Sequence, residues 1–266
     1  MVIDGKAIAE NIYKDLAGFF AGRNAKLGLL VVGVDAVIGS FVRIKTRGAQ
    51  RLGIECVRID LPADATTADV IDRTRKLAGE TDAIIVQLPL PAQVDTNAVL
   101  SSIPPNKDVD ALNPRHSHER FVEAPVALAV VEILHHSKVA IAGKRAVVVG
   151  AGRLVGAPSA HLLKSLGATV SMFTLQEGSI ADLKDADIVV SGAGNPSFIK
   201  PEHLKRGVAL IDAGASEQAG KIKGDADPAC AEIASVFSPV PGGVGPVAVA
   251  MIFRNLKALI EKKNSS

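Results

Sequence analysis

A glycine-rich turn is the first part of the sequence whose residue types could bind a ligand. Gly150 and Gly152 follow the apolar run at residues 145–149, and Gly156 opens a stretch with helical periodicity. Such glycines let the backbone turn tightly and approach a pyrophosphate, while the first turn of a helix offers unpaired N–H groups and a favourable dipole. The spacing Gly-x-Gly-x-x-x-Gly is one residue longer than the usual fingerprint. The turn therefore predicts a dinucleotide site, with simple packing of strand on helix as the alternative.

Two later segments repeat the arrangement of an apolar run followed by glycine. They are residues 192–194 and 212–215, and dinucleotides lie at the edge formed by the carboxyl ends of parallel strands. Glu177 is suitably placed downstream to bond a ribose hydroxyl, although a solvated loop glutamate is the alternative. The residues expected to contact the cofactor are Gly150, Ala151, Gly152, Gly156 and Ala215.

A lysine on a predicted helix could do proton chemistry. Phe41 and Lys45 lie one helical turn apart in the stretch 37–52, so they share one face and could reach the same pocket. A lysine held in such a pocket could act as a base or a proton relay near neutral pH. The alternative is a solvated lysine in a basic helix, because Arg43 and Arg47 lie nearby and exposed lysines are the rule.

Gln87 and the Pro/Gly-rich segment 239–246 are two further candidates. Gln87 ends an apolar run, where a buried amide needs partners that a ligand or the backbone of the following Pro-rich turn could supply. Gly242 and Gly243, after Pro241, would let the backbone approach a ligand closely. A tight turn before the last helix would require the same residues.

Metal chemistry and nucleophilic catalysis are not expected. His116 and His118 flank a serine, and His135 and His136 end a predicted helix, but neither pair has an identifiable third ligand or supporting shell. No Ser-His-Asp or Cys-His arrangement suggests an activated nucleophile.

The elements that position these residues follow from the hydrophobic pattern. Short apolar runs alternate with longer amphipathic stretches, which is typical of parallel strands covered by helices on both faces. We expect an α/β fold of two domains, an N-terminal α/β domain and a Rossmann-type domain with a parallel sheet. The boundary is placed near Ser137, giving domains at 1–136 and 137–246, with the last helix, 247–266, packing back on the first domain. The expected strands are residues 27–32, 54–59, 82–87, 145–149, 168–173, 186–190 and 208–212, and the expected helices are 5–20, 37–52, one opened by Thr66 and Thr67, 126–136 and 247–262.

The composition excludes several classes of protein. Of 266 residues, 48% are hydrophobic, which supports well-buried cores, and 30 basic against 28 acidic side chains leave a formal charge of +2. That balance and the 3% of aromatic residues argue against nucleic-acid binding. Cys56 and Cys230 are too few for a disulfide framework and too isolated for a zinc site, which fits a reducing compartment. Asp4, Lys6 and Glu10 interrupt any secretory peptide, and no later apolar run is long enough for a membrane span, so we expect a cytoplasmic protein without membrane contact.

Five segments, in order along nearly the whole chain, form a specific combination. Two of them are the most distinctive, Val86-Gln-Leu-Pro-Leu-Pro91 and Ser238-Pro-Val-Pro-Gly-Gly-Val-Gly-Pro246. The others are Lys107-Asp-Val-Asp110, the glycine turn at residues 149–158, and Gly224-Asp225. Together these segments resemble the bifunctional methylenetetrahydrofolate dehydrogenase/methenyltetrahydrofolate cyclohydrolase family.

The resemblance implies a fold, a reaction and a set of site residues. It implies two domains that flank a cleft, in a homodimer, with NADP as the expected cofactor and a reduced folate as the substrate. Hydride would pass from the methylene carbon that bridges two folate nitrogens to the nicotinamide, and water would open the resulting methenyl cation to 10-formyltetrahydrofolate. Lys45, Gln87 and Asp110 are the implied catalytic residues, with Asp110 anchoring the folate ring or, alternatively, capping its own loop. The residues expected to contact folate are Phe41, Lys45, Gln87, Asp110, Pro241, Gly242 and Gly243.

Departures from the family pattern in the first half bear on the activities. Phe41 stands where the family has a tyrosine beside the lysine, which removes a hydroxyl from the cyclohydrolase step and opens the alternative of a dehydrogenase alone. Ile38 replaces a common serine, and residues 124–127 replace a Pro-Cys-Thr-Pro segment near the nicotinamide. A paralogue that binds folate or nucleotide without turnover is therefore a further alternative.

Departures in the second half bear on the cofactor. Ala151 replaces a frequent arginine, and the segment 174–177 lacks any basic residue. NAD is therefore an alternative to NADP, favoured by Glu177, because a free ribose accepts a carboxylate. Arg153 could still reach the 2′-phosphate of NADP.

Overall fold

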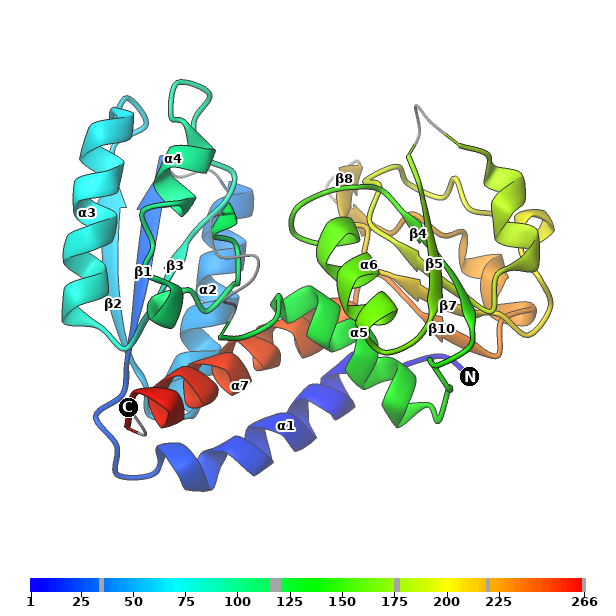
Figure 1. The fold of residues 1–266 in the computed structure, drawn as a ribbon, viewed down its shortest axis with the longest axis horizontal. Coiled ribbons are helices and arrows are strands. Elements are labelled where there is room, and N and C mark those ends of the chain that lie inside the picture. Colours follow the sequence, from blue (N-terminus) through cyan, green and yellow to red (C-terminus); the bar gives the residue numbers. More distant parts are fainter. Residues whose placement is uncertain (34–35, 115–120, 175–177, 219–220, 265–266) are drawn as a thin grey trace. The chain divides into compact units, whose positions relative to one another are not determined.

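The chain folds into two compact units, each built around a parallel sheet (Figure 1). The computed structural model describes residues 1–33, 36–114, 121–174, 178–218 and 221–264. Unit 1 comprises Met1–Asn11 and Ala124–Met251, and unit 2 comprises Ile12–Glu123 and Ile252–Ser266. Helices α1 (Gly5–Phe20) and α7 (Val244–Asn264) supply residues to both units. The predicted α/β class is confirmed.

The compact units divide the chain at a different point from the boundary predicted near Ser137. The change to unit 1 comes at Ala124, because α5 (Pro125–His136) packs on α6 (Gly156–Ser165) of the same unit. The first residues also join unit 1, since the Phe237 N–H donates to Met1 O (2.9 Å) and the Ile3 N–H donates to Phe237 O (2.9 Å). The domain limits 1–136 and 137–246 stay a prediction.

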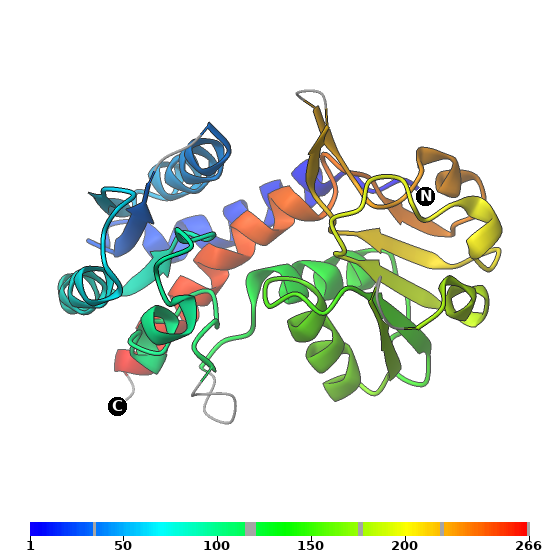
Figure 2. The same ribbon diagram turned by 90° about the horizontal axis from the view of Figure 1, so that it is seen from above.

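Unit 2 carries helices on both faces of a three-stranded sheet. The order of its parallel strands is β2-β1-β3, with bounds β1 (Lys26–Val32), β2 (Glu55–Leu61) and β3 (Ala83–Val86). Helix α2 (Ala36–Arg51) covers one face and α3 (Thr67–Glu80) covers the other (Figures 1 and 2). The central strand is covered on both sides, which explains its uninterrupted apolar sequence. Helix α3 begins, as predicted, at the Thr66 cap, whose side chain forms a capping box with Asp69.

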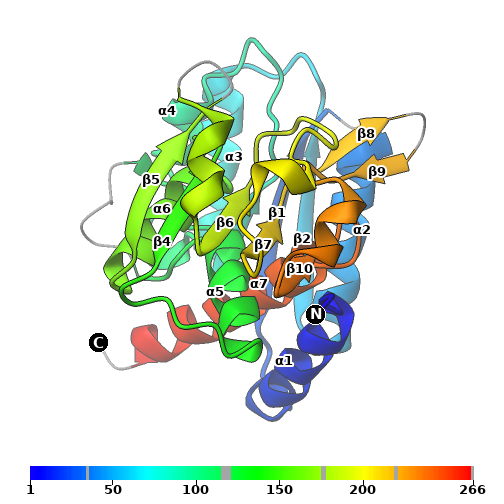
Figure 3. The same ribbon diagram turned by 90° about the vertical axis from the view of Figure 1, so that its right-hand side faces the viewer.

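Unit 1 is built on a five-stranded parallel sheet with the order β10-β7-β6-β4-β5 (Figure 3). The strands are β4 (Arg145–Val149), β5 (Thr169–Phe173), β6 (Ile188–Ser191), β7 (Ala209–Asp212) and β10 (Val236–Ser238). The chain runs from β4 outward to β5 and then returns past β4 to β6, so the connections after β4 and β6 lead in opposite directions. Ligands of open α/β sheets bind in the crevice beside such a topological switch point.

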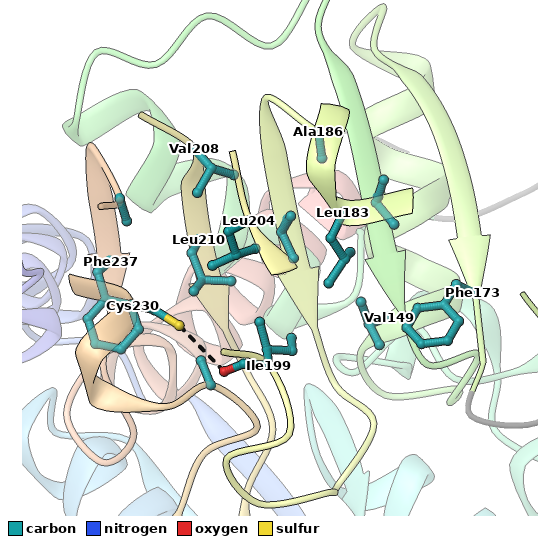
Figure 4. Packing of buried hydrophobic residues seen from close by; sticks show 14 residues of the cluster. Val149, Phe173, Leu183, Ala186, Ile199, Leu204, Val208, Leu210, Cys230 and Phe237 are labelled. Carbon is teal, nitrogen blue, oxygen red and sulfur yellow. Dashed lines mark hydrogen bonds between the residues drawn. The ribbon is translucent and has the colours of Figure 1, made fainter. Parts of the chain in front are cut away.

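The two faces of this sheet are covered by different structures, whereas we expected α-helices on both. Helix α6 packs on β4, β5 and β6. The residues on the opposite face, among them Val147, Val149 and Leu210, belong to a buried cluster with Leu183 and Cys230 (Figure 4). Leu183 comes from the short 3-10 helix η3 (Ile180–Asp185) and Cys230 from η5 (Pro228–Glu232). A third short helix, η4 (Pro201–His203), lies in the connection from β6 to β7.

Several short elements were not predicted, and one helix begins earlier than expected. Helix α7 begins at Val244 rather than at residue 247, because Pro246 lies in the first turn, where no backbone N–H is needed. Besides η3, η4 and η5, the unpredicted elements include α4 (Thr96–Leu100), η1 (Pro105–Lys107), the antiparallel pair β8 (Ser216–Gln218) and β9 (Lys221–Lys223), and β10. None of the helices in the described part of the chain has the length and apolar character needed to span a bilayer.

Gly48 provides a test of the packing in unit 2. A Cβ atom on this residue of α2 would lie 2.6 Å from Phe253 Cε2 and 2.6 Å from Tyr13 Oη. Both aromatic side chains are buried, and their ring centroids are 5.9 Å apart. We predict that Gly48→Ala lowers the free energy of unfolding by about 1–3 kcal/mol, because this packed region would have to shift. Urea unfolding measures the change.

Gly79 offers the matched control for that substitution. It lies near the end of α3, and no atom lies within 4 Å of the position that its Cβ would take. Gly79→Ala is expected to raise the free energy of unfolding by up to about 1 kcal/mol, since alanine is the better helix former. Equal effects at the two glycines would contradict the packing role of Gly48.

Candidate functional site

Lys45 and Gln87 are joined by a hydrogen bond in unit 2. Lys45 Nζ, on α2, donates to Oε1 of Gln87 at 3.0 Å, and Gln87 directly follows β3. Gln87 is only 6% exposed, and its Nε2 donates to Leu88 O at 2.6 Å. Because an ammonium group only donates, the atom that faces Lys45 must be the amide oxygen. The amide of Gln87 therefore bonds the backbone of the Pro-rich turn, which was the alternative to a ligand contact, and at the same time holds the lysine.

Asp110 belongs to the same group of side chains. Burial raises the pKa of the Asp110 carboxyl, and the positive charge of Lys45 opposes that rise. The carboxylate and the ammonium are thus close enough to interact electrostatically. Lys45, Gln87 and Asp110 together are called the Lys45 cluster below.

Two buried side chains that the sequence did not single out hold the Asp110 loop. Asp108 Oδ2 accepts the backbone N–H of Asn113 at 2.7 Å, which closes the loop around Asp110. Asn255, on α7, donates from Nδ2 to Val109 O at 2.9 Å and to Glu123 O at 2.8 Å, which fastens both ends of the segment 109–123. Loop capping, considered for Asp110, is therefore carried out by Asp108. The only sign of this in the sequence was the pair Asp108-x-Asp110, of which Asp108 caps the loop and Asp110 is left for the predicted contact with folate.

Phe41 lies one turn before Lys45 on α2 and is 43% exposed. Ile44 on the same helix is also exposed, so α2 presents apolar surface beside the Lys45 cluster. Such a surface suits contact with a flat ring system. Ile38 is buried, so it contributes to packing rather than to this surface.

Pro241, Gly242 and Gly243 belong to unit 1, in the turn between β10 and α7. The Gly243 N–H donates to Pro239 O at 2.8 Å, and the Gly5 N–H donates to Gly242 O at 2.9 Å. A Cβ on Gly243 would lie 2.6 Å from Pro239 O, so the tight turn alone requires this glycine. Gly242 differs from Gly243. Its φ is 107°, and no atom lies within 4 Å of the position that a Cβ would take, so this side of the residue is open.

The glycine turn of unit 1 leads tightly from β4 into α6 and is open at Gly152. Gly150 directly follows β4 and has φ 96°, and a Cβ on Gly156 would lie 1.8 Å from Gly150 O, so α6 starts in close contact with the turn. Gly152 is exposed with open space around it, and the N-cap residue Val155 provides no side-chain cap. The turn therefore leaves backbone and helix start available to a dinucleotide. Of the other predicted contacts, Ala151 and Ala215 are exposed.

The loops after β4 and β6 touch each other at the switch point. A Cβ on Gly150 would lie 2.7 Å from Gly192 O, and one on Gly192 would lie 2.4 Å from Val155 Cγ1. The predicted glycine-containing strand ends at 150–156 and 192–194 are thus brought together. Glu177, His116 and His118 lie outside the described residues, and within the described ranges no group of three or more His, Cys, Asp or Glu could hold a metal ion.

Comparison with known proteins matches the two halves of the chain to two domain families. Residues 3–110 match the tetrahydrofolate dehydrogenase/cyclohydrolase catalytic domain, and residues 124–264 match the tetrahydrofolate dehydrogenase/cyclohydrolase NAD(P)-binding domain. The bifunctional protein FolD of Methanospirillum hungatei is 38% identical over 96% of this chain and 95% of its own length. FolD of Staphylococcus aureus is 34% identical, with 96% and 94% covered.

Solved structures give the same result. The Trypanosoma brucei methylenetetrahydrofolate dehydrogenase-cyclohydrolase, complexed with NADP and an inhibitor, superposes with a TM-score of 0.93 at 34% identity, covering 100% of this chain and 99% of its own. The bifunctional enzyme of Thermoplasma acidophilum superposes with a TM-score of 0.92 at 27% identity, covering 100% of both chains.

Asp108 gives the site a predictable dependence on pH. Burial raises its pKa to about 6, although the backbone N–H groups of Asn113 and Leu112 oppose the rise. The folded chain therefore holds this proton more tightly than the unfolded chain, and the resulting stability is lost as the pH rises through about 6. Asp108→Asn keeps an acceptor for Asn113 and does not ionise. We predict that it gains about 3 kcal/mol in free energy of unfolding relative to wild type between about pH 4 and pH 7.

Urea unfolding at several pH values across this range measures that gain. Asp64→Asn, at an exposed position, is the control and should follow the wild type throughout. A difference between Asp108→Asn and wild type that stays constant with pH would show that the Asp108 carboxylate is not penalised by burial.

Proposed function

We infer that this chain, which belongs to the tetrahydrofolate dehydrogenase/cyclohydrolase family, is a bifunctional enzyme of one-carbon metabolism. It oxidises 5,10-methylenetetrahydrofolate to 5,10-methenyltetrahydrofolate with NADP and hydrolyses the product to 10-formyltetrahydrofolate. The observation that carries the assignment of residues is the hydrogen bond from Lys45 to Gln87 beside the charge of Asp110. The formyl product would serve purine biosynthesis.

The residues proposed to contact the reduced folate have chemistry that suits its ring system. Asp110 accepts hydrogen bonds from adjacent N–H and amino donors of the ring system, for which a carboxylate is a suitable partner. Phe41 supplies apolar contact for the ring, and Pro241, Gly242 and Gly243 let the backbone approach it. The open side of Gly242 supports this role.

The first chemical step is removal of hydride from the methylene carbon that bridges two folate nitrogens. NADP, when bound, accepts this hydride. The substrate then carries a methenyl cation, and the carboxylate of Asp110 offsets the positive charge of Lys45 near it. The partial negative charge on Gln87 Oε1 acts in the same direction as the charge of the carboxylate.

The second step is attack of water on the methenyl carbon. Lys45 relays the proton that this water loses: its ammonium gives one proton to the departing folate nitrogen and takes up the proton from the water, and Gln87 fixes the position of Nζ for that transfer. Phe41 has no hydroxyl to share this task, so the hydrogen bond that Lys45 donates to Gln87 orients the lysine here. The protein therefore carries out the cyclohydrolase step without the family's tyrosine.

Lys45→Met tests the role of the lysine. We predict that the cyclohydrolase rate falls by about two to four powers of ten, because a positioned proton-transfer group contributes that much. The dehydrogenase rate should fall less, since hydride transfer needs no proton relay. Absorbance of NADPH and decay of the methenyl product measure the two rates separately.

Lys76→Met is the matched control, because Lys76 is exposed on α3. It should leave both rates unchanged. A Lys45→Met variant that opens the methenyl product as fast as wild type would refute the assignment of Lys45, whereas a wild type without turnover would refute the proposed function itself.

NADP is the cofactor. We propose that Arg153 supplies a cation for its 2′-phosphate. Arg153 follows Gly152 in the exposed part of the glycine turn. We predict that Arg153→Ala raises the KM for NADP by about tenfold, the effect of one lost charge-assisted hydrogen bond, and leaves the KM for NAD unchanged. Initial rates measured with NADP and with NAD give the two KM values.

Arg145→Ala is the control for that variant. Arg145 lies at the other end of β4, where it pairs with Asp185 at 3.5 Å, so its loss should affect neither cofactor. Equal increases in KM for NADP and NAD in Arg153→Ala would exclude a specific contact with the 2′-phosphate.

A homodimer in the cytoplasm completes the proposal. Strand β5 forms one edge of the five-stranded sheet, and its residue Met172 is 45% exposed, although strands of parallel sheets are usually covered. A second copy pairing along this edge would cover it. The free thiols of Cys56 and Cys230 fit a reducing compartment.

A further inference from the structure

Two buried aspartates lie at the carboxyl edge of the unit 1 sheet. Asp212 ends β7 and is 1% exposed, and Asp225 follows β9 and is 0% exposed. Gly224-Asp225 is one of the segments that resemble the family, yet the reaction described above gives it no task.

Asp225 gathers three donors from the end of β6 and the loop that follows. Its Oδ2 accepts the Ser191 hydroxyl at 2.6 Å and the Ala193 N–H at 2.7 Å. Its Oδ1 accepts the Asn195 N–H at 2.8 Å. One carboxylate therefore sets the backbone direction of residues 191–195.

Asp212 in turn holds the segment that carries Asp225. Its Oδ1 accepts the Gly214 N–H at 3.0 Å and the Asp225 N–H at 3.2 Å, and its Oδ2 accepts the Ala226 N–H at 2.8 Å. The two carboxylates together bind six donors. They tie the loop after β6 and the loop after β7 to the segment 224–226.

Two glycines leave room for these carboxylates. A Cβ on Gly214 would lie 2.2 Å from Cγ of Asp225, and a Cβ on Gly224 would lie 2.1 Å from Oδ2 of Asp212. The side chains and the glycines therefore fit as one unit, with no space for a methyl group at either glycine.

The need for stability does not explain this arrangement, because the buried carboxylates lower the stability of the fold. Burial raises the pKa of Asp212 to about 7, and the negative charge of Asp225 adds to that effect, although backbone N–H groups oppose it. Burying like charges side by side is unfavourable, and apolar packing would hold a loop at lower cost. A requirement for loop geometry explains the arrangement better than a requirement for stability.

The loop that Asp225 holds forms one side of the switch point. Its Gly192 carbonyl faces Gly150, and Gly192 itself packs against Val155 of the glycine turn. Any shift of residues 191–195 would therefore displace the turn that receives the pyrophosphate.

We propose that Asp225, braced by Asp212, is a positioning residue for the dinucleotide, because it fixes the loop after β6 against the glycine turn at residues 150–156. This role rests on the proposed function, since it presupposes that unit 1 binds NADP. Asp225 and Asp212 would not contact the cofactor themselves. They would hold the loops whose backbone contacts it.

Asp225→Asn tests the role with little change of shape. Asparagine keeps one acceptor oxygen and places an NH₂ group where the other was, so the N–H of either Ala193 or Asn195 would meet a donor. We expect the Kd of NADP, measured by calorimetry without folate, and the KM for NADP to rise by about tenfold or more. The KM for methylenetetrahydrofolate should stay within about twofold, and the thermal midpoint should hold, because a buried charge is removed along with the hydrogen bond.

Asp187→Asn is the matched control, because Asp187 directly precedes β6 at the opposite end of the strand, where it pairs with Lys205 at 2.7 Å. It should leave the constants for NADP unchanged. Normal NADP binding by Asp225→Asn would overturn the inference, as would a parallel loss of NADP binding, folate KM and thermal stability, which indicates a merely structural role.

Ser191→Ala decides the matter if Asp225→Asn does not fold. It removes the hydroxyl donor and leaves both backbone donors of the carboxylate in place. A severalfold rise in the Kd of NADP supports the positioning role, and an unchanged Kd overturns it. Failure of the wild type to bind NADP would instead defeat the proposed function, so the two failures are distinguishable.

Discussion

The site in unit 2 depends on one hydrogen bond, from the Lys45 ammonium to the Gln87 amide oxygen. Gln87 follows β3 directly. Its side-chain NH₂ group donates to Leu88 O, which fixes the orientation of the amide oxygen. Lys45 comes from α2, on one face of the same sheet. The position of a long, flexible side chain is thereby determined by a strand end, and the charge of Asp110 completes its surroundings. The chemistry proposed for Lys45 requires such a fixed position, because proton transfer depends on geometry before it depends on acidity.

The two units achieve precision by different means. In unit 2 the functional groups are side chains, and buried polar residues such as Asp108 and Asn255 hold the loop that carries one of them. In unit 1 the expected contacts are made largely by backbone, so glycines allow the loops to touch, and buried carboxylates hold them from behind. Both units use hydrogen bonds between distant parts of the chain to hold these loops. Both also place charged groups where water is scarce, which is unfavourable for stability but useful for a defined geometry.

Much of the fold could be predicted because its strands are apolar runs between glycine-rich turns, and β4 followed by Gly150 is the clearest example. The strand β10 was missed because three residues give no periodic signal, and the start of α7 was misplaced because Pro246 suggested a loop. The family resemblance placed Lys45, Gln87 and Asp110 in one site. It gave no indication of Asn255, which bonds Val109 from 146 positions away, since no local pattern encodes such a contact. The division of labour between Asp108 and Asp110 was equally invisible, because the two residues look alike in sequence.

The discontinuous composition of the two units has a consequence for biosynthesis. Unit 1 takes in the first residues of the chain as well as residues 124–251, and unit 2 takes in residues 252–266 as well as residues 12–123. A chain that leaves the ribosome from its N-terminus therefore exposes the strands of unit 2 long before the segment that carries Asn255 has been made. Until then the carbonyl groups of Val109 and Glu123 lack the partner that they have in the finished protein. Unit 2 therefore cannot reach its final form when its strands are first made, but only after residues 124–251, which belong to unit 1, and the segment that carries Asn255 have followed.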